Sequence, residues 1–243
     1  MPSAIRIFSK AIELYKSRFI PLIILSTLAF IFGHLIPLTI IHFVIFTSIS
    51  IVLWMVLSEN IGVVEAFKRS RSKFINFFIV SLLVVLVFYG GLFMLVVPGI
   101  IFMIWFSFSA IIAALEGDRG FDALLKSKAY VAGKWWTIFW YFIFMGTVIM
   151  VPLMSLEAIY EHYEYLSAMR ALLTSIRVLY AILGILAFPF YSAYMLSIYL
   201  SLKNAKPELV NQKPGGSKGF FIFSAVLGII VVTGMFALAL FFG

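Results

Sequence analysis

The chain has 243 residues, of which 64% are hydrophobic and only 12% are charged, and its formal net charge is +8. A soluble domain of this length carries about 25% charged residues, so these figures exclude a water-soluble globular protein and indicate an all-α integral membrane protein. The absence of cysteine excludes disulfides, thiolate metal sites and a cysteine nucleophile. The basic residues lie in short clusters between long apolar runs, which is a topological pattern and argues against a nucleic-acid partner.

The N-terminal part of the chain predicts an interfacial helix followed by a membrane hairpin. Residues 1–18 are basic and amphipathic, so we expect a helix that lies in the cytoplasmic interface. The apolar residues of its predicted face are Ile5, Phe8, Ile12, Tyr15 and Phe19. Residues 19–57 contain no charged side chain, and a single helix of these 39 residues would be ~58 Å long, about twice the hydrocarbon thickness. We therefore expect two spans with a turn at Gly33, His34 and Pro37.

Residues 58–115 repeat this arrangement. A basic segment ends at Lys73, and the following 42 residues are uncharged as far as Leu115. This run is again too long for one crossing. Proline lacks an amide donor and glycine tolerates positive φ, so Pro98-Gly99 is the predicted turn.

Residues 116–134 form a third basic segment with a short amphipathic helix. Phe121, Leu124, Leu125 and Ala129 share its apolar face, and Asp122, Lys126 and Ser127 point elsewhere. Gly133 is the predicted helix stop. The Trp135-Trp136 pair is expected to anchor the next span at the headgroups.

The last part of the chain predicts two spans around an acidic loop, a linker and a final span. Residues 136–156 cross the membrane, and residues 155–177 are expected to form a short helix on the extracytoplasmic surface. Residues 178–202 return, with a kink at Pro189. Residues 203–218 read as a cytoplasmic linker and residues 219–243 as a C-terminal transmembrane helix.

The resulting fold is a bundle of about seven transmembrane helices, arranged as three hairpins joined by cytoplasmic amphipathic helices plus one C-terminal span. The predicted membrane domain, residues 1–202, consists of three helix-plus-hairpin units, residues 1–57, 58–115 and 116–202. The cytoplasmic segments carry 16 of the 18 Lys and Arg residues. The positive-inside rule then predicts a cytoplasmic N-terminus and an extracytoplasmic C-terminus in the cell (inner) membrane.

The units also resemble one another in sequence. Glu65-Ala66-Phe67-Lys68-Arg69-Ser70 matches Asp122-Ala123-Leu124-Leu125-Lys126-Ser127, since each has an acidic residue and alanine followed by a basic residue and serine. Such matches indicate an internal parallel repeat. The alternative is that any membrane protein alternates basic loops with apolar runs.

One stretch resembles a known family. Its residues are Pro98-Gly99, Trp105, Glu116-Gly117, Ala123, Lys126-Ser127 and Gly133-Lys134-Trp135-Trp136. They resemble the pattern of the membrane domain fused to some glycerophosphoryl diester phosphodiesterases and of related small prokaryotic membrane proteins. The resemblance implies a six-span fold, from which the seventh apolar run departs. Because the sequence contains no soluble phosphodiesterase-like stretch, the resemblance implies no lipid hydrolysis.

Basic side chains beside the predicted spans are candidate contacts for anionic lipid headgroups. They are Lys68, Arg69, Arg71, Lys73, Lys126, Lys128 and Lys134. Positive-inside topology alone also explains them, and the two interpretations overlap because such residues lie among anionic lipids.

The acidic loop is a second candidate site. Glu157, Glu161 and Glu164 have helical spacing and could bind a cation, and Arg177 could pair with Glu157 or Glu161. The alternative is a solvated loop helix with Arg177 extending to the headgroups. No metal and no cofactor is predicted.

No motif of a known catalytic centre occurs in the sequence. We therefore expect a multi-pass membrane protein without catalysis, a lipid-associated or scaffold module. Its expected partners are a bilayer with anionic headgroups and, as open possibilities, further copies of itself or other membrane proteins. A small-solute transporter or pore formed by the three hairpins is the alternative, and a lipid-modifying enzyme is a third, weaker hypothesis.

Overall fold

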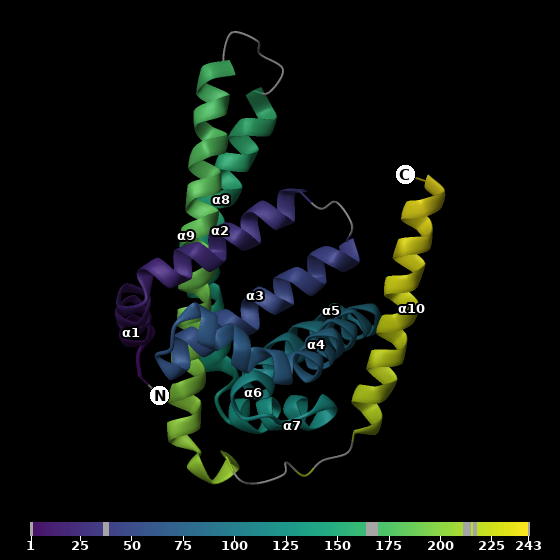
Figure 1. Cartoon of the computed structure of the whole chain (residues 1–243). Helices are drawn as coiled ribbons and strands as arrows, with labels where there is room; N and C mark the ends of the chain where they lie inside the picture. The colour runs from purple at the N-terminus through teal and green to yellow at the C-terminus, as the bar shows by residue number, and fades with distance from the viewer. Residues whose placement is uncertain (1, 36–38, 164–169, 211–214, 216–217, 243) are drawn as a thin grey trace. The chain divides into compact units, whose positions relative to one another are not determined.

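The structure, a computed structural model, describes residues 2–35, 39–163, 170–210, 215 and 218–242, with the side chains of residues 33–42, 236 and 238–242 excepted. It is 91% helical, and no strand occurs in the described part of the chain. The helices (Figure 1) are α1 (Ala4–Ser17), α2 (Phe19–Leu35), α3 (Thr39–Glu59), α4 (Val63–Met94), α5 (Val96–Phe106), α6 (Ser109–Leu115), α7 (Gly120–Val131), α8 (Trp135–Tyr163), α9 (Arg170–Ala205), the 3₁₀ helix η2 (Pro207–Val210) and α10 (Gly219–Phe242).

Contacts group the chain into two compact units. Unit 1 contains residues 67–138 and 199–243, and unit 2 contains residues 2–66 and 139–198. The helices α4, α8 and α9 each continue from one unit into the other. The predicted division into three helix-plus-hairpin units follows the chain order and stays a prediction, whereas these contacts combine segments that are distant in the sequence.

Four apolar segments are long enough to cross a membrane: Val63–Met94, Val96–Leu115, Trp135–Tyr163 and Arg170–Ala205. A fifth arises if α1 and the Phe19–Phe32 part of α2, which meet at a bend of 89°, are counted as one broken span. These helices suggest a membrane location. The segments of α3 and α10 whose side chains are described, Phe43–Glu59 and Gly219–Met235, are apolar but shorter than a full crossing. The structure therefore supports four to five spans and does not establish the predicted seven.

The predicted N-terminal helix exists as α1. Ser3 caps it by accepting a hydrogen bond from the Arg6 amide at 3.4 Å. The packed face is rotated from the predicted one, because Ile7 and Ala11 are buried whereas Ile5 is 72% exposed.

Unit 2 packs α1 and α2 against the α8–α9 pair. The rings of Phe8 and Tyr15 each meet Phe190 of α9 edge to face. The Tyr141 hydroxyl donates to the carbonyl of Pro2, and the Tyr194 hydroxyl donates to the carbonyl of Tyr141 at 3.2 Å. The hydroxyls of Tyr141 and Tyr194 therefore find their acceptors within the protein.

In unit 1 the turn between the second pair of spans lies at Leu95, not at the predicted Pro98-Gly99. Leu95 is extended, with φ −172° and ψ 153°, between the end of α4 and the start of α5. Pro98 lies in the first turn of α5, where a missing amide costs nothing because the first helical N–H groups have no partner in the helix. Pro98-Gly99 therefore lies just after the turn, inside α5, and not in the turn itself.

The basic segment of residues 58–73 is also different from the prediction. It is not a separate interfacial helix, because α4 runs without a break from Val63 to Met94. Its basic residues therefore occupy the first turns of the same helix that carries the apolar span.

The C-terminal helix α10 packs into unit 1 along one face. Phe221, Ser224, Ala225 and Gly228 are buried at helical spacing. The Ser224 hydroxyl donates to the carbonyl of Val87 in α4 at 3.0 Å. The first half of α10 is thus an integral part of unit 1.

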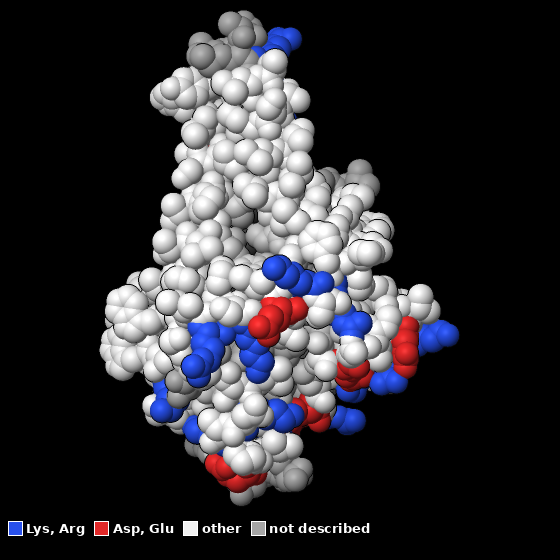
Figure 2. All heavy atoms as spheres, turned by 90° about the vertical axis from the view of Figure 1, so that its left-hand side faces the viewer, with Lys and Arg blue, Asp and Glu red and all other residues white. Residues whose placement is uncertain are grey.

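Charged side chains are unevenly distributed. Figure 2 shows that the visible face of the α8–α9 hairpin is uncharged except for a basic side chain near its tip. In the sequence, residues 135–156 of α8 and 178–202 of α9 contain no Asp, Glu, Lys or Arg. Such a surface is typical of helices in contact with lipid.

Candidate functional site

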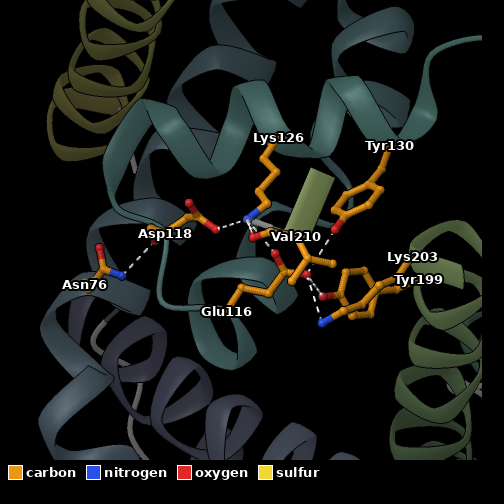
Figure 3. A network of polar contacts seen from close by, with 8 residues as sticks. All are labelled: Asn76, Glu116, Asp118, Lys126, Tyr130, Tyr199, Lys203 and Val210. Carbon is orange, nitrogen blue, oxygen red and sulfur yellow. Dashed lines mark hydrogen bonds and ion pairs between the residues drawn. The ribbon is translucent and has the colours of Figure 1, made fainter. Parts of the chain in front are cut away.

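The most highly charged buried cluster of the described residues lies in unit 1, at the end of α6. Glu116 caps this helix, and its side chain is 5% exposed. Lys126 of α7, which is 3% exposed, places its Nζ 2.6 Å from Oε2 of Glu116 and 2.7 Å from Oδ2 of Asp118 (Figure 3). The ammonium also donates to the carbonyl of Val210 in η2 at 2.9 Å. One lysine therefore joins α6, the following loop and η2.

The second oxygen of Glu116 is also surrounded by donors. Tyr130 of α7 donates to Oε1 at 3.2 Å, and the hydroxyl of Tyr199 in α9 donates to the same atom. Nζ of Lys203 lies 3.2 Å from it (Figure 3). We call Glu116, Asp118, Lys126, Tyr130, Tyr199 and Lys203 the Glu116 network.

The local backbone explains how these groups meet. Gly117 has φ +83°, which turns the chain sharply after α6. The side-chain amide of Asn76 in α4 donates from Nδ2 to the backbone carbonyl of Asp118 at 2.9 Å and fixes the loop (Figure 3). The loop thereby returns α7 over the end of α6, with Lys126 directed at Glu116.

The charges of the Glu116 network compensate one another. Burial alone would raise the pKa of Glu116, but hydrogen bonds from Lys126 and Tyr199 and the nearby positive charges outweigh it and lower this pKa. Burial alone would lower the pKa of Lys126, and its hydrogen bonds to Asp118 and Glu116 reverse this effect and raise it. Both groups are therefore held in their charged forms. Since two carboxylates meet two ammonium groups, the arrangement suits a structural clamp better than a general base or nucleophile.

A second lysine holds the end of α7. Nζ of Lys206 donates to the carbonyls of Ala129 and Ala132 at 2.6 and 2.7 Å. Gly133 has φ +77°, so the predicted helix stop is confirmed. Residues 203–210, predicted as linker, therefore belong to the end of α9 and to η2, and they contact α7.

The prediction that Lys126 and Ser127 point away from the packed face of α7 is wrong. Ser127 is fully buried and donates to the carbonyl of Trp105 at 2.7 Å, while its oxygen accepts from the amide of Phe108 at 3.2 Å. It thus bridges the break between α5 and α6. The prediction assumed that α7 buries a single apolar face, whereas its neighbours cover it on more than one side.

The structure places Lys126, one of the predicted lipid contacts, inside unit 1. Its ammonium is surrounded by Glu116, Asp118 and the carbonyl of Val210. Two other candidates are engaged within unit 1. Lys73 donates to the carbonyl of Ala114 at 2.9 Å, and the ammonium of Lys128 lies 4.3 Å from the centroid of the Trp105 ring.

The remaining basic candidates are at the surface. Lys68, Arg69 and Arg71 are exposed in the first turns of α4, and Lys134 is exposed between α7 and α8. The exposed indole of Trp136 follows Lys134 in the chain. These residues keep the side-chain access that headgroup contact requires.

The acidic candidates do not form a separate surface helix. Glu157 and Glu161 lie in the last turns of α8, and Glu164 lies outside the described residues. The guanidinium of Arg177 in α9 lies 4.7 Å from the centroid of the Tyr160 ring, and no ion pair joins it to Glu157 or Glu161 among the described atoms. The described residues contain no group of three His, Cys, Asp or Glu that could hold a metal.

Two of the cavities that the described residues line belong to unit 2. One, of ≈ 520 Å³, lies among α1, α2, α8 and α9 and has an apolar and aromatic lining that includes Tyr15, Pro152 and Phe190. The other, of ≈ 470 Å³, has Glu157 in its lining; we call it the Glu157 cavity. Its further lining residues are Ser26, Ala29, Phe30, Phe46, Leu153, Tyr180, Gly184, Ile185 and Phe188.

The sequence interpretation missed the Glu116 network. One signal was present: Ala123-Leu124-Leu125 and Tyr130-Val131 flank Lys126, which indicates a nearly buried helix rather than one lying at a surface. The partners Tyr199 and Lys203 are more than 80 residues from Glu116, and helical periodicity says nothing about such contacts.

Comparison with family models, with curated proteins and with solved structures finds no match to this chain.

Proposed function

We propose that this chain is a multi-pass membrane protein without catalysis that associates with anionic lipids through its exposed basic residues, as a lipid-associated or scaffold module. The observation that carries the proposal is a contrast between two sets of charges. The carboxylates and ammonium groups of the Glu116 network neutralise one another, whereas Lys68, Arg71 and Lys134 are exposed beside apolar spans.

The geometry around Lys134 supports this function. Lys134 precedes α8, and Trp136 and Trp140 are 68% and 61% exposed in the first turns of that helix. Indole rings favour the headgroup zone, and a lysine at the same depth attracts anionic lipid by about 1 kcal/mol. On α4, Lys68 and Arg71 have the same relation to the apolar run that follows them.

The proposal includes the orientation and the family. A cytoplasmic N-terminus in the cell (inner) membrane would place these basic residues on the leaflet that attracts them. The proposed kinship with the phosphodiesterase-linked membrane domains agrees with a non-catalytic role, because none of the shared motifs is catalytic.

Tryptophan quenching by brominated lipids tests the proposal. The purified protein is reconstituted in bilayers in which either the anionic or the zwitterionic lipid is brominated, and the relative lipid affinity is obtained from the quenching. We expect a preference for the anionic lipid that decreases about fivefold in Lys134→Gln, since about 1 kcal/mol is lost.

The matched control is Lys73→Gln, since the ammonium of Lys73 is already engaged by the carbonyl of Ala114 within unit 1. Orientation is checked in each variant by labelling single introduced cysteines, which the cysteine-free chain permits. Equal preference for both lipids in the wild-type protein, or equal quenching in Lys134→Gln and the wild type, would contradict the proposal.

The transporter or pore alternative has one specific observation in its favour, the two cavities of unit 2. Its test is the flux of a panel of small solutes into proteoliposomes. Flux that depends on the protein would favour the alternative over a scaffold.

A further inference from the structure

The Glu157 cavity combines one carboxylate with several aromatic rings. Glu157, contributed by α8, is the only charged residue among its described lining residues, and its side chain is exposed, so the carboxylate stands at the rim of the cavity. The aromatic side chains of the lining are Phe30, Phe46, Tyr180 and Phe188. The rings of Phe46 and Phe188 lie 5.1 Å apart, centroid to centroid, and are inclined by 49°.

This lining has a definite chemical preference. Aromatic faces attract cations, most strongly where water is scarce. A carboxylate in the same cavity adds a full negative charge and repels anions. The Ser26 hydroxyl is already engaged, because it donates to the carbonyl of Ile185. An apolar cavity with this one charge discriminates by the sign of the ligand's charge.

Among the described residues, no ion pair joins Glu157 to Arg177, the basic side chain on the same stretch of α9. Arg177 precedes Tyr180 by three residues, and its guanidinium lies over the ring of Tyr160, 4.7 Å from the centroid. The guanidinium is not among the described lining of the cavity. The carboxylate therefore remains available to a bound cation.

We propose that the Glu157 cavity binds a lipophilic organic cation, that is, a quaternary ammonium or phosphonium compound with an apolar body. The cationic centre lies between Glu157 and the rings of Phe46 and Phe188, and the apolar body fills the cavity. The volume of ≈ 470 Å³ is in the range of small-molecule sites. This site lies in unit 2 and does not depend on the lipid-headgroup contacts proposed above.

Binding of radiolabelled tetraphenylphosphonium to the full chain tests the site. The protein is held in nanodiscs of phosphatidylcholine only, so that anionic lipid does not concentrate the cation. Tetraphenylborate has nearly the same shape and the opposite charge, and it serves as the matched ligand control. We expect saturable binding of the phosphonium and none of the borate.

Four variants locate the site. Glu157→Gln should weaken phosphonium binding about tenfold, equivalent to about 1.4 kcal/mol, and Phe188→Leu about twofold to fivefold by removing one ring. Glu161→Gln, an exposed carboxylate of the same helix outside the described lining, should leave binding unchanged. Arg177→Gln should strengthen binding, because it removes a nearby positive charge.

Several results would overturn the proposal. One is non-saturable uptake equal to that of empty nanodiscs, which would mean that lipid chains occupy the cavity. Others are equal effects of Glu157→Gln and Glu161→Gln, or equal binding of both ions. Thermal unfolding of each variant separates lost binding from misfolding. If Glu157→Gln does not fold, the other two variants still test the proposal, because phosphonium binding should weaken in Phe188→Leu and strengthen in Arg177→Gln.

Discussion

The hydroxyl of Ser26 in α2 donates a hydrogen bond of 2.5 Å to the backbone carbonyl of Ile185 in α9. Within a helix this carbonyl would accept from the amide four residues later, but that residue is Pro189, which has no N–H. Ser26 is 2% exposed, so its hydroxyl supplies the donor that proline removes, and it does so from another helix. In an apolar environment a carbonyl without a partner is expensive.

Replacing Ser26 by alanine should therefore destabilise unit 2. We expect Ser26→Ala to lower the free energy of unfolding by about 1–3 kcal/mol, because a buried carbonyl loses its donor. In a Pro189→Ala background the helix regains its own amide, and the same serine replacement should have a smaller effect. Chemical unfolding in a mild detergent measures both differences.

A matched control for this prediction is Ser50→Ala, since Ser50 donates only to the Phe46 carbonyl of its own helix. That carbonyl keeps its helical amide partner, so a change below about 0.5 kcal/mol is expected. A loss of stability from Ser26→Ala that is the same with and without Pro189 would disprove the link between the two residues.

The Glu116 network gives a second prediction. Lys126→Met should lower the free energy of unfolding by about 3–5 kcal/mol, because it leaves buried carboxylates without their shared counter-ion. Glu116→Gln combined with Lys126→Met should recover part of this loss, since the most buried charge is then also removed. Thermal unfolding of the single and double variants provides the measurement, analysed as a double-mutant cycle.

Lys128→Met is the control for Lys126→Met. Lys128 follows Lys126 by two residues in α7, and its ammonium lies over the rings of Trp105 and Phe221. Losing this cation–π contact should cost about 1 kcal/mol. Equal losses of unfolding free energy from the two replacements would show that the ion pairs of Lys126 contribute no more than the cation–π contacts of Lys128.

Stability should also depend on pH through the same network. The pKa of Glu116 is below its ordinary value of 4.5, so its contribution is present above pH 4.5 and is lost as the pH falls through the lowered pKa. The pKa of Lys126 is above its ordinary value of 10.5, so its contribution is present below pH 10.5 and is lost as the pH rises through the raised pKa. Between these limits both contributions are constant.

The thermal unfolding midpoint, followed from pH 7 to pH 3, checks the acid side of this prediction. In Glu116→Gln the group no longer titrates, so the midpoint should fall less steeply than in the wild type. Parallel curves for the two proteins would show that other carboxylates cause the loss.

Much of the fold follows from the sequence alone. Uncharged runs such as residues 74–115 require apolar helices, and a glycine with positive φ ends α7 at the expected place. The exact turn at Leu95 could not be predicted, because a proline such as Pro98 fits the first turn of a helix as well as it fits a chain reversal. The packed face of α1 is rotated by about one residue, roughly 100°, from the predicted face for a related reason: Ala11 contributes to packing but little to a hydrophobic pattern.

The site was less accessible to sequence reasoning. In the sequence Lys126 is one of several basic residues that the positive-inside rule counts alike, and only its contacts with Glu116 and Val210 distinguish it. Those contacts depend on how α6, α7 and η2 meet, which periodicity within one helix does not specify. For the same reason no pattern in the sequence assigns the Ser26 hydroxyl to the carbonyl that Pro189 leaves free.

The contact of α10 with α4 gives the last prediction. A Cβ atom added at Gly228 would lie 1.9 Å from the carbonyl oxygen of Leu86, and one added at Gly90 would lie 1.8 Å from that of Ser224. Neither backbone can yield without moving a whole helix, so Gly228→Ala should lower the free energy of unfolding by about 1–3 kcal/mol. Gly234→Ala on the same helix meets nothing within 4 Å and should be neutral or stabilising, by up to about 1 kcal/mol, since alanine favours helix. Thermal unfolding of the two variants compares them directly, and equal effects would mean that the two helices do not cross at this glycine pair.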